Sequence, residues 1–265
     1  MPLSLRFALR ELRSGVAGFR IFLACLALGV AAIAAAGSTA EAFRAGLAVQ
    51  AREILGGDLR LSVDRRLFTP AERERFGAMG KTAWSAAASA MAEAPSGERR
   101  LVELRGVSDT YPLAGKVGLE GADSLAAAFY PEGDAAGAAV EQALLDRLNL
   151  KLGDTFLVGE AKFIARAVLV SEPDRLGRGF ALGPRVLTGI EAVKAGGFLQ
   201  PGMPNTNEAV RIALKPELAT NAGVDRLVKR LKADGFEARG RNEAGGGFKR
   251  LIDQLEYFLG FIGLA

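Results

Sequence analysis

The chemistry open to this chain is limited by the side chains that it lacks. None of its 265 residues is histidine, and its one cysteine is Cys25. This excludes Ser-His-Asp and Cys-His catalysis, zinc sites with histidine ligands and histidine pH switches. Carboxylates are scattered through different predicted elements, without a spacing typical of acid/base catalysis, and we expect solvated strand and turn positions for Asp58, Asp64, Glu72, Glu103 and Asp154. We therefore predict no catalytic residue, no metal site and no cofactor.

A polar, glycine-rich loop over residues 171 to 185 is the one candidate for phosphate binding. It contains Gly177, Gly179 and Gly183. The Walker pattern G-x-x-x-x-G-K-[ST] is absent, and the loop does not open an obvious helix after a strand. A solvated loop is the simpler interpretation, so the sequence predicts no ATP site.

A stripe of basic residues near the start points to docking rather than catalysis. Arg6, Arg10 and Arg13 lie beside an apolar stripe in a predicted helix over residues 2 to 16. Such a helix would lie on a membrane surface with its arginines among anionic head groups. We predict that these arginines dock a cytoplasmic partner and the membrane, and a plain topology signal is the alternative.

The chain's only triple glycine is a candidate hinge. It comprises Gly245, Gly246 and Gly247, directly before an apolar segment at helical spacing. Glycine adopts backbone angles that other residues resist, so the triplet could absorb rotation between neighbouring elements. A simple linker is the alternative.

The element that must position these groups is a run of twenty uncharged residues, Ile21 to Ala40. A helix of this length is about 30 Å long, enough to cross the hydrocarbon core of a bilayer. Four arginines and one glutamate precede it, which predicts a cytoplasmic N-terminus. Helical spacing continues to Ile54, and Gly56-Gly57 supplies a stop. We predict one helix over residues 19 to 55, first membrane-spanning and then a periplasmic stalk.

Three other interpretations of this run fit the sequence less well. A cleavable signal peptide fits Ala34-Ala35-Ala36 but gives no reason for the helical pattern to continue past Ala40. A lipoprotein signal ending at Cys25 leaves too short an apolar region after Arg20. A buried helix of a soluble protein rarely runs so far without a charge.

Composition argues against nucleic-acid binding. The formal net charge is +4, and the first twenty residues carry +3 of it, from four arginines and Glu11. The remainder is nearly neutral and shows no basic stripe with interleaved aromatic residues. One cysteine permits no disulfide within the chain, as in many bacterial periplasmic domains. We expect a protein of the bacterial inner membrane with its main domain in the periplasm.

Alternating and helical patterns predict an α+β domain after the stalk. A strand over 58 to 63, a helix opened by a Thr69–Glu72 capping box and a strand over 82 to 92 form a β-α-β unit. Residues 207 to 241 repeat this order, so we expect one lobe built from both flanks. The predicted elements between the flanks are strands over 101 to 107, 155 to 158 and 163 to 170, a helix marked by Val140, Leu144 and Leu148, and a short helix over 190 to 195.

This order of elements and several short motifs resemble the FtsX/MacB-like permeases of ABC transporters. Leu55-Gly56-Gly57-Asp58-Leu59 is similar to the start of that family's first periplasmic strand. Residues 143 to 154, ALLDRLNLKLGD, and 163 to 170 are similar to its LA-x-x-L-x-L-x-x-GD … F-x-V stretch. Residues 172 to 175, EPDR, with 183 to 187, GPRVL, are similar to the YbbP-like branch. Members carry more membrane helices, so we expect an N-terminal fragment.

Pattern and resemblance together divide the chain. The expected parts are a cytoplasmic amphipathic segment (1–18), a transmembrane helix with a periplasmic stalk (19–55), a porter-like periplasmic lobe (56–97 and 206–244), an inserted periplasmic lobe (98–205), and a glycine hinge with a truncated second transmembrane helix (245–265). The resemblance implies a non-catalytic permease that relays ATP hydrolysis to its periplasmic domain, the mechanotransmission type, with hydrophobic or lipid-like substrates in several relatives. The implied partners are a cytoplasmic, YbbA-like ABC ATPase, membrane lipid and, as a further candidate, a periplasmic protein.

Two functions of other classes stay open. A singly anchored periplasmic binding or sensor module suits the length of the chain but not its apolar C-terminal residues. An anchored hydrolase, such as a lipid esterase, fits poorly because histidine is absent.

Overall fold

The computed structural model describes residues 22–31, 34–35, 37–38, 51–173, 183–199 and 207–243, which fall into two separate units. In the first unit, residues 22 to 31 are helical and exposed. Within the described ranges, no helix combines the length and the apolar character needed to span a bilayer. Most residues of the two segments predicted to contain membrane helices, 19 to 55 and 245 to 265, lie outside these ranges. Membrane anchoring therefore stays a prediction.

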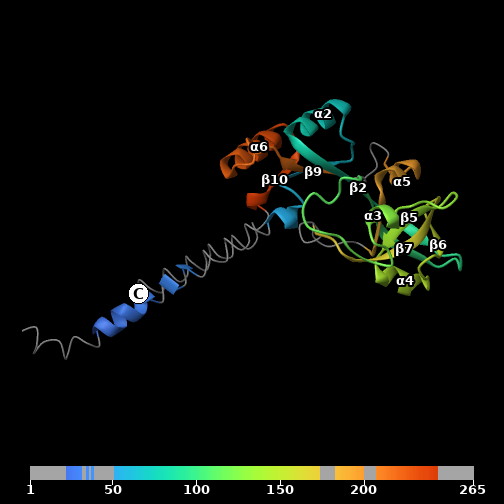
Figure 1. Cartoon of the computed structure of the whole chain (residues 1–265), viewed down its shortest axis with the longest axis horizontal. Helices are drawn as coiled ribbons and strands as arrows, with labels where there is room; N and C mark the ends of the chain where they lie inside the picture. Colours follow the sequence, from blue (N-terminus) through green and yellow to red (C-terminus); the bar gives the residue numbers. More distant parts are fainter. Residues whose placement is uncertain are drawn as a thin grey trace, which may run out of the picture. The chain divides into compact units, whose positions relative to one another are not determined.

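The second unit is a mixed α+β domain built on one ten-stranded sheet (Figure 1). Its strands are β1 (Leu59–Asp64), β2 (Gly80–Glu93), β3 (Arg99–Val107), β4 (Gly118–Glu120), β5 (Ala136–Val140), β6 (Thr155–Val158), β7 (Ala161–Ser171), β8 (Arg185–Gly189), β9 (Asn207–Leu214) and β10 (Glu237–Gly240). Its helices are α2 (Pro70–Met79), α3 (Leu125–Ala128), α4 (Gln142–Leu148), α5 (Ile190–Ala195), α6 (Asn221–Ala233) and the 3-10 turn η1 (Arg241–Glu243). The strand order is β10-β1-β9-β2-β3-β8-β5-β7-β4, and β6 pairs with β2 and β7.

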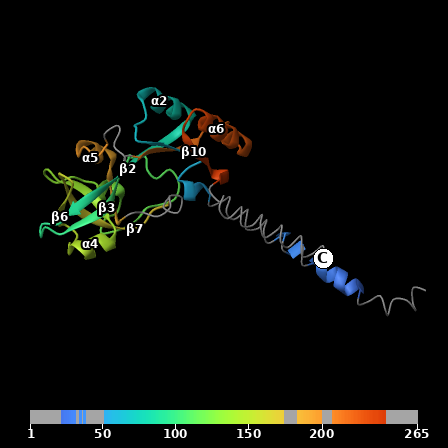
Figure 2. The ribbon, with the colours of Figure 1, turned by 180° about the vertical axis from the view of Figure 1, so that it is seen from behind.

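The first two and last two strands form a ferredoxin-like arrangement. The segments β1-α2-β2 and β9-α6-β10 are split β-α-β units, because β9 lies between β1 and β2 while β1 lies between β9 and β10. All three pairings are antiparallel. Helices α2 and α6 lie together on this part of the sheet (Figures 1 and 2), where Phe76 and Leu231 join a buried cluster with Leu59 and Leu61.

Local signals start and stop these elements at the predicted places. The side chain of Thr69 accepts a hydrogen bond from the Glu72 amide, and the Glu72 carboxylate accepts one from the Thr69 amide, so the capping box is present. The helical turn over residues 51 to 55 stops at Gly56, whose φ is 77°. The Gly57 amide then donates to the carbonyl of Arg52 at 2.9 Å, closing the helix end.

Strand β2 belongs to both ends of the sheet. Its residues 80 to 87 pair with β9, residues 85 to 93 pair with β3, and the last two pair with β6. A second buried cluster, which includes Leu144, Phe163 and Val186, fills the part around α4 and β7. Figure 2 places α4 and β6 at the end of the sheet away from α2 and α6. Because β2 is shared, the proposed division into lobes (56–97 with 206–244, and 98–205) stays a prediction.

Two predictions about the middle of the chain are wrong. Val140 ends strand β5 and does not mark α4, which begins at Gln142 after an extended Glu141. The segment 171 to 185 is not wholly a solvated loop, since its first residue ends β7 and Arg185 opens β8. Strand β8 pairs with β3 in parallel, a contact between residues about 80 positions apart that no local pattern reports.

Candidate functional site

The site residues predicted from the sequence lie outside the described residues. They are Arg6, Arg10, Arg13, Gly245, Gly246 and Gly247, and their roles stay predictions. The described residues do include both places where the chain joins the second unit. The helical turn over residues 51 to 55, which we call the incoming helix, ends just before β1, and the outgoing chain leaves through η1 just after β10. Because Leu59 pairs with Gly240 in the antiparallel β1–β10 ladder, these two places are neighbours.

A buried carboxylate, Asp58, holds this junction together. Its side chain accepts a hydrogen bond from Arg241 Nη1 at 2.7 Å and another from the Leu214 amide at 3.0 Å. Arg52, in the last turn of the incoming helix, forms an ion pair with it at 3.3 Å. The amide of Arg241 also donates to the backbone carbonyl of Asp58 at 3.0 Å. One carboxylate therefore connects the incoming helix, the end of β9 and the outgoing chain, and we call this set of contacts the Asp58 junction.

The expectation that Asp58 is solvated is wrong, because the residue is only 1% exposed. Its main partner, Arg241, is 183 positions away, so no local spacing could indicate the pair. The expectation holds for Asp64 and Asp154, which are exposed on a strand end and in a turn. Glu72 serves the capping box at the start of α2. The expectation does not hold for Glu103, which is half-buried and accepts a hydrogen bond from the buried Arg185 at 2.8 Å.

A second group of charges is buried where β3, β7 and β8 come together. Arg105 and Arg185 each donate to a different oxygen of the Glu172 carboxylate, and the three side chains are at most 4% exposed. Burial alone would lower the pKa of Arg185, but the carboxylates of Glu172 and Glu103 outweigh it and raise that pKa above its ordinary value. The arginine therefore stays charged, and these ion pairs connect the residue that follows β7 to β3 and β8. We call Arg105, Glu172 and Arg185 the buried ion cluster.

Sequence reasoning missed this cluster, although a signal was present. Glu172 and Arg185 both belong to the motifs that resemble the YbbP-like branch, at the two ends of the glycine-rich loop. Arg105 lies two positions after Glu103 in β3, so the alternation of side chains along a strand places both on the same face of the sheet. This pattern could have indicated that the two charges lie close together.

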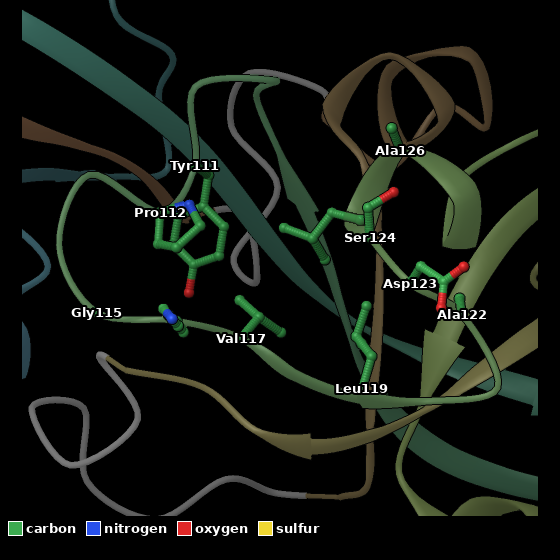
Figure 3. A pocket seen from close by; sticks show the side chains of 11 residues that line it. Tyr111, Pro112, Gly115, Val117, Leu119, Ala122, Asp123, Ser124 and Ala126 are labelled. Atoms are coloured by element: carbon green, nitrogen blue, oxygen red, sulfur yellow. The ribbon is translucent and has the colours of Figure 1, made fainter.

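Tyr111 connects the buried ion cluster to a pocket of about 530 Å³, which we call the Tyr111 pocket. Its hydroxyl donates to Glu172 at 3.4 Å, and the Arg105 guanidinium lies 4.9 Å from the centre of its ring. Figure 3 shows the ring of Tyr111 and the side chains of Val117 and Leu119 facing the same space. The other lining residues are Pro112, Gly115, Lys116, Ala122, Asp123, Ser124, Leu125 and Ala126. The volume is typical of small-molecule sites.

Among the residues that the structure describes, no group of His, Cys, Asp and Glu side chains is placed to hold a metal ion. What the geometry provides is a rigid junction, a buried ion cluster and a mixed apolar and polar pocket.

Comparison with known proteins points to the class of ABC transporter permeases. The sequence similarity confirms the resemblance to the FtsX/MacB-like family and its YbbP-like branch. The relative in question is the uncharacterized ABC transporter permease YbbP of Escherichia coli (strain K12), which is 28% identical over 180 residues, 67% of this chain. The match spans 21% of that protein's length. No protein-family model matches the chain.

Two solved structures show partial likeness. The periplasmic region of MacB from Actinobacillus actinomycetemcomitans covers 75% of this chain and 95% of its own, with 11% identity and a TM-score of 0.45. The extracellular domain of the noncanonic ABC-type transporter YknZ from Gram-positive bacteria covers 69% of this chain and 100% of its own, with 13% identity and a TM-score of 0.44.

Proposed function

We propose that this chain belongs to a permease subunit of the mechanotransmission type. It is held in the bacterial inner membrane with its N-terminus in the cytoplasm and its α+β domain in the periplasm. ATP hydrolysis by a separate, YbbA-like ATPase moves the incoming helix, and the domain follows that movement. The substrates are hydrophobic or lipid-like, and the permease itself performs no catalysis.

The observation that carries this proposal is the Asp58 junction. A domain that must follow the movement of membrane helices needs a stiff connection where the chain joins it. Here the incoming helix, through Arg52, and the outgoing chain, through Arg241, contact one buried carboxylate. Buried charge pairs resist separation because breaking one leaves an uncompensated charge, at a cost of about 3–5 kcal/mol. The similarity to YbbP supports the same conclusion independently of this geometry.

The test is capture of the ATPase by the full-length permease. Both proteins are produced together in a bacterial membrane, the permease is purified in detergent, and bound ATPase and its hydrolysis rate are measured. We expect co-purification, and we expect that replacing Arg6, Arg10 and Arg13 with alanine weakens it. The matched control replaces three exposed basic residues of α6, Arg226, Lys229 and Arg230, and should leave capture unchanged. Equal capture by both triple variants would remove the N-terminal arginines from the interface, and no capture by the wild type would contradict the proposal.

A singly anchored binding or sensor module is the second candidate, because the Tyr111 pocket has the volume of a ligand site. Labelling of single cysteines separates the two functions. Cys25 is first replaced by serine, and one cysteine is then placed after Gly263 in the full-length protein. Labelling of that position only from the periplasm would favour the sensor over the transporter.

A further inference from the structure

We propose that the loop from Tyr111 to Gly118 links the end of the incoming helix to the buried ion cluster, so that displacement of this helix reshapes the Tyr111 pocket. The inference extends the proposed function and rests on it for its purpose. The contacts that make the link are independent of that function and can be tested separately.

The middle of the loop passes close to both partners at Gly115. A Cβ atom added to this glycine would lie 2.6 Å from Cβ of Pro173 and 3.8 Å from Cβ of Glu53. Glu53 belongs to the last turn of the incoming helix, and Pro173 directly follows Glu172 of the buried ion cluster. The loop backbone therefore lies against the helix end and against the cluster at one position. Gly115 also has φ of 76°, a conformation that favours glycine.

Both ends of the loop are fastened to the same cluster region. At one end, the Tyr111 hydroxyl donates to Glu172, and Arg105 lies over the ring. At the other end, Gly118 pairs with Ser171 in the β4–β7 ladder, and an added Cβ would lie 2.5 Å from the Ser171 hydroxyl. Because the segment is held at both ends and has little free space at Gly115, a displacement at its middle is passed on rather than absorbed.

The pocket lies along this same loop. Tyr111, Gly115 and Val117 all line it, and its far wall is formed by residues 122 to 126. A shift of Gly115 relative to that wall changes the shape of the pocket directly. The pocket is therefore a place where movement of the incoming helix would be felt by a bound molecule.

The test is hydrogen exchange in the full chain, in detergent and without the ATPase. Gly115→Ala forces a Cβ against Pro173, and we expect about tenfold faster exchange at two remote places. These are the Gly57 amide, which bonds to the end of the incoming helix, and the amides of β8 beside the cluster. The matched control is Gly133→Ala. Gly133 also has positive φ, of 59°, but an added Cβ meets nothing within 4 Å. We expect exchange in this variant to change only near residue 133.

The outcomes separate the link from the proposed function. If Gly115→Ala changes exchange only within residues 111 to 118, or if Gly133→Ala gives the same remote pattern, the link is wrong. If Gly115→Ala does not fold, Pro173→Gly removes the opposing Cβ atom instead, and the same two places should exchange faster. ATPase capture judges the proposed function in a separate experiment, so a complex that forms normally alongside a purely local exchange response would overturn the link alone.

Discussion

Replacing Asp58 with alanine is the sharpest test of the junction. The carboxylate is 1% exposed and holds Arg241, the Leu214 amide and Arg52. Removing one partner of a buried charge pair costs about 3–5 kcal/mol. The side chains of Arg241 and Arg52 are 24% and 49% exposed, so both can regain water when the carboxylate is lost. We therefore expect a loss near the lower limit, about 3 kcal/mol, or a fall in Tm of about 6–12 °C for a domain of this size.

The assay can use the chain's single tryptophan, Trp84. It lies in β2, its ring is 5.3 Å from that of Phe68, and the Arg73 guanidinium lies 4.3 Å from its centre. Its fluorescence therefore reports the ferredoxin-like part, where the junction lies. Urea unfolding of the full chain in detergent, followed at Trp84, gives the free energy of unfolding for each variant.

Asp64→Ala is the matched control, because Asp64 is the last residue of β1, the strand that Asp58 directly precedes. Asp64 is exposed and accepts one hydrogen bond, from Asn207 at 2.7 Å, so we expect a change within about 0.5 kcal/mol. In a double-mutant cycle, Asp58→Ala and Arg241→Ala should be coupled by about 1–3 kcal/mol. If Asp58→Ala is no more destabilising than Asp64→Ala, or if the coupling is zero, the junction does not hold the chain as argued.

Three further predictions concern other parts of the chain. Glu172→Gln should destabilise the domain by about 3–5 kcal/mol, because two buried arginines lose their carboxylate. Glu103→Gln weakens a single pair, with the buried Arg185, and should cost less, about 1.5 kcal/mol; urea unfolding compares the two. A hydrogen bond from Arg66 lowers the pKa of Glu72 below its ordinary value of 4.5. The Glu72 carboxylate therefore contributes to the stability of the fold above that pH, and this contribution is lost as pH falls through the lowered pKa. Glu72→Gln should lack this acid-dependent loss, and Tm measured against pH for both proteins shows whether it does. Replacing residues 245 to 247 with alanine should leave folding and ATPase capture normal but stop ATP-driven transport, and unaltered transport would leave a simple linker.

Features defined by near neighbours could be predicted from the sequence. The capping box at Thr69 and the helix stop at Gly56 depend on residues within a few positions, and both lie where expected. The strand-helix-strand order of both flanks follows from periodicity. The burial of α6 reproduces its helical spacing, whereas in β1 the polar Ser62 is buried together with its apolar neighbours. The α+β class was predictable for the same reason.

Features defined by distant partners could not be predicted. Asp58 reads as a turn residue until Arg241 is brought beside it, and Glu172 reads as a loop residue until Arg105 and Arg185 surround it. A single sequence records charge but not pairing, so a buried carboxylate and a solvated one look alike. Strand β5 was missed for another reason, since Ala136 to Val140 is mostly alanine and glycine, which have low strand propensity.

The pairing of β1 with β10 explains why the junction needs more than ladder bonds. Leu59 is opposite Gly240, so the incoming and outgoing chains leave this antiparallel pair from the same end. Forces that pull these two chain segments apart would open the ladder one hydrogen bond at a time. A sheet resists this direction of force least, because each bond contributes only about 1 kcal/mol net. The Asp58–Arg241 ion pair and the Arg241 amide bond to the Asp58 carbonyl lie just outside the first rung. An opening force would therefore meet a charge-assisted contact with the buried Asp58 before it reached the ladder, and under the proposed function the domain would move as one body instead of unzipping.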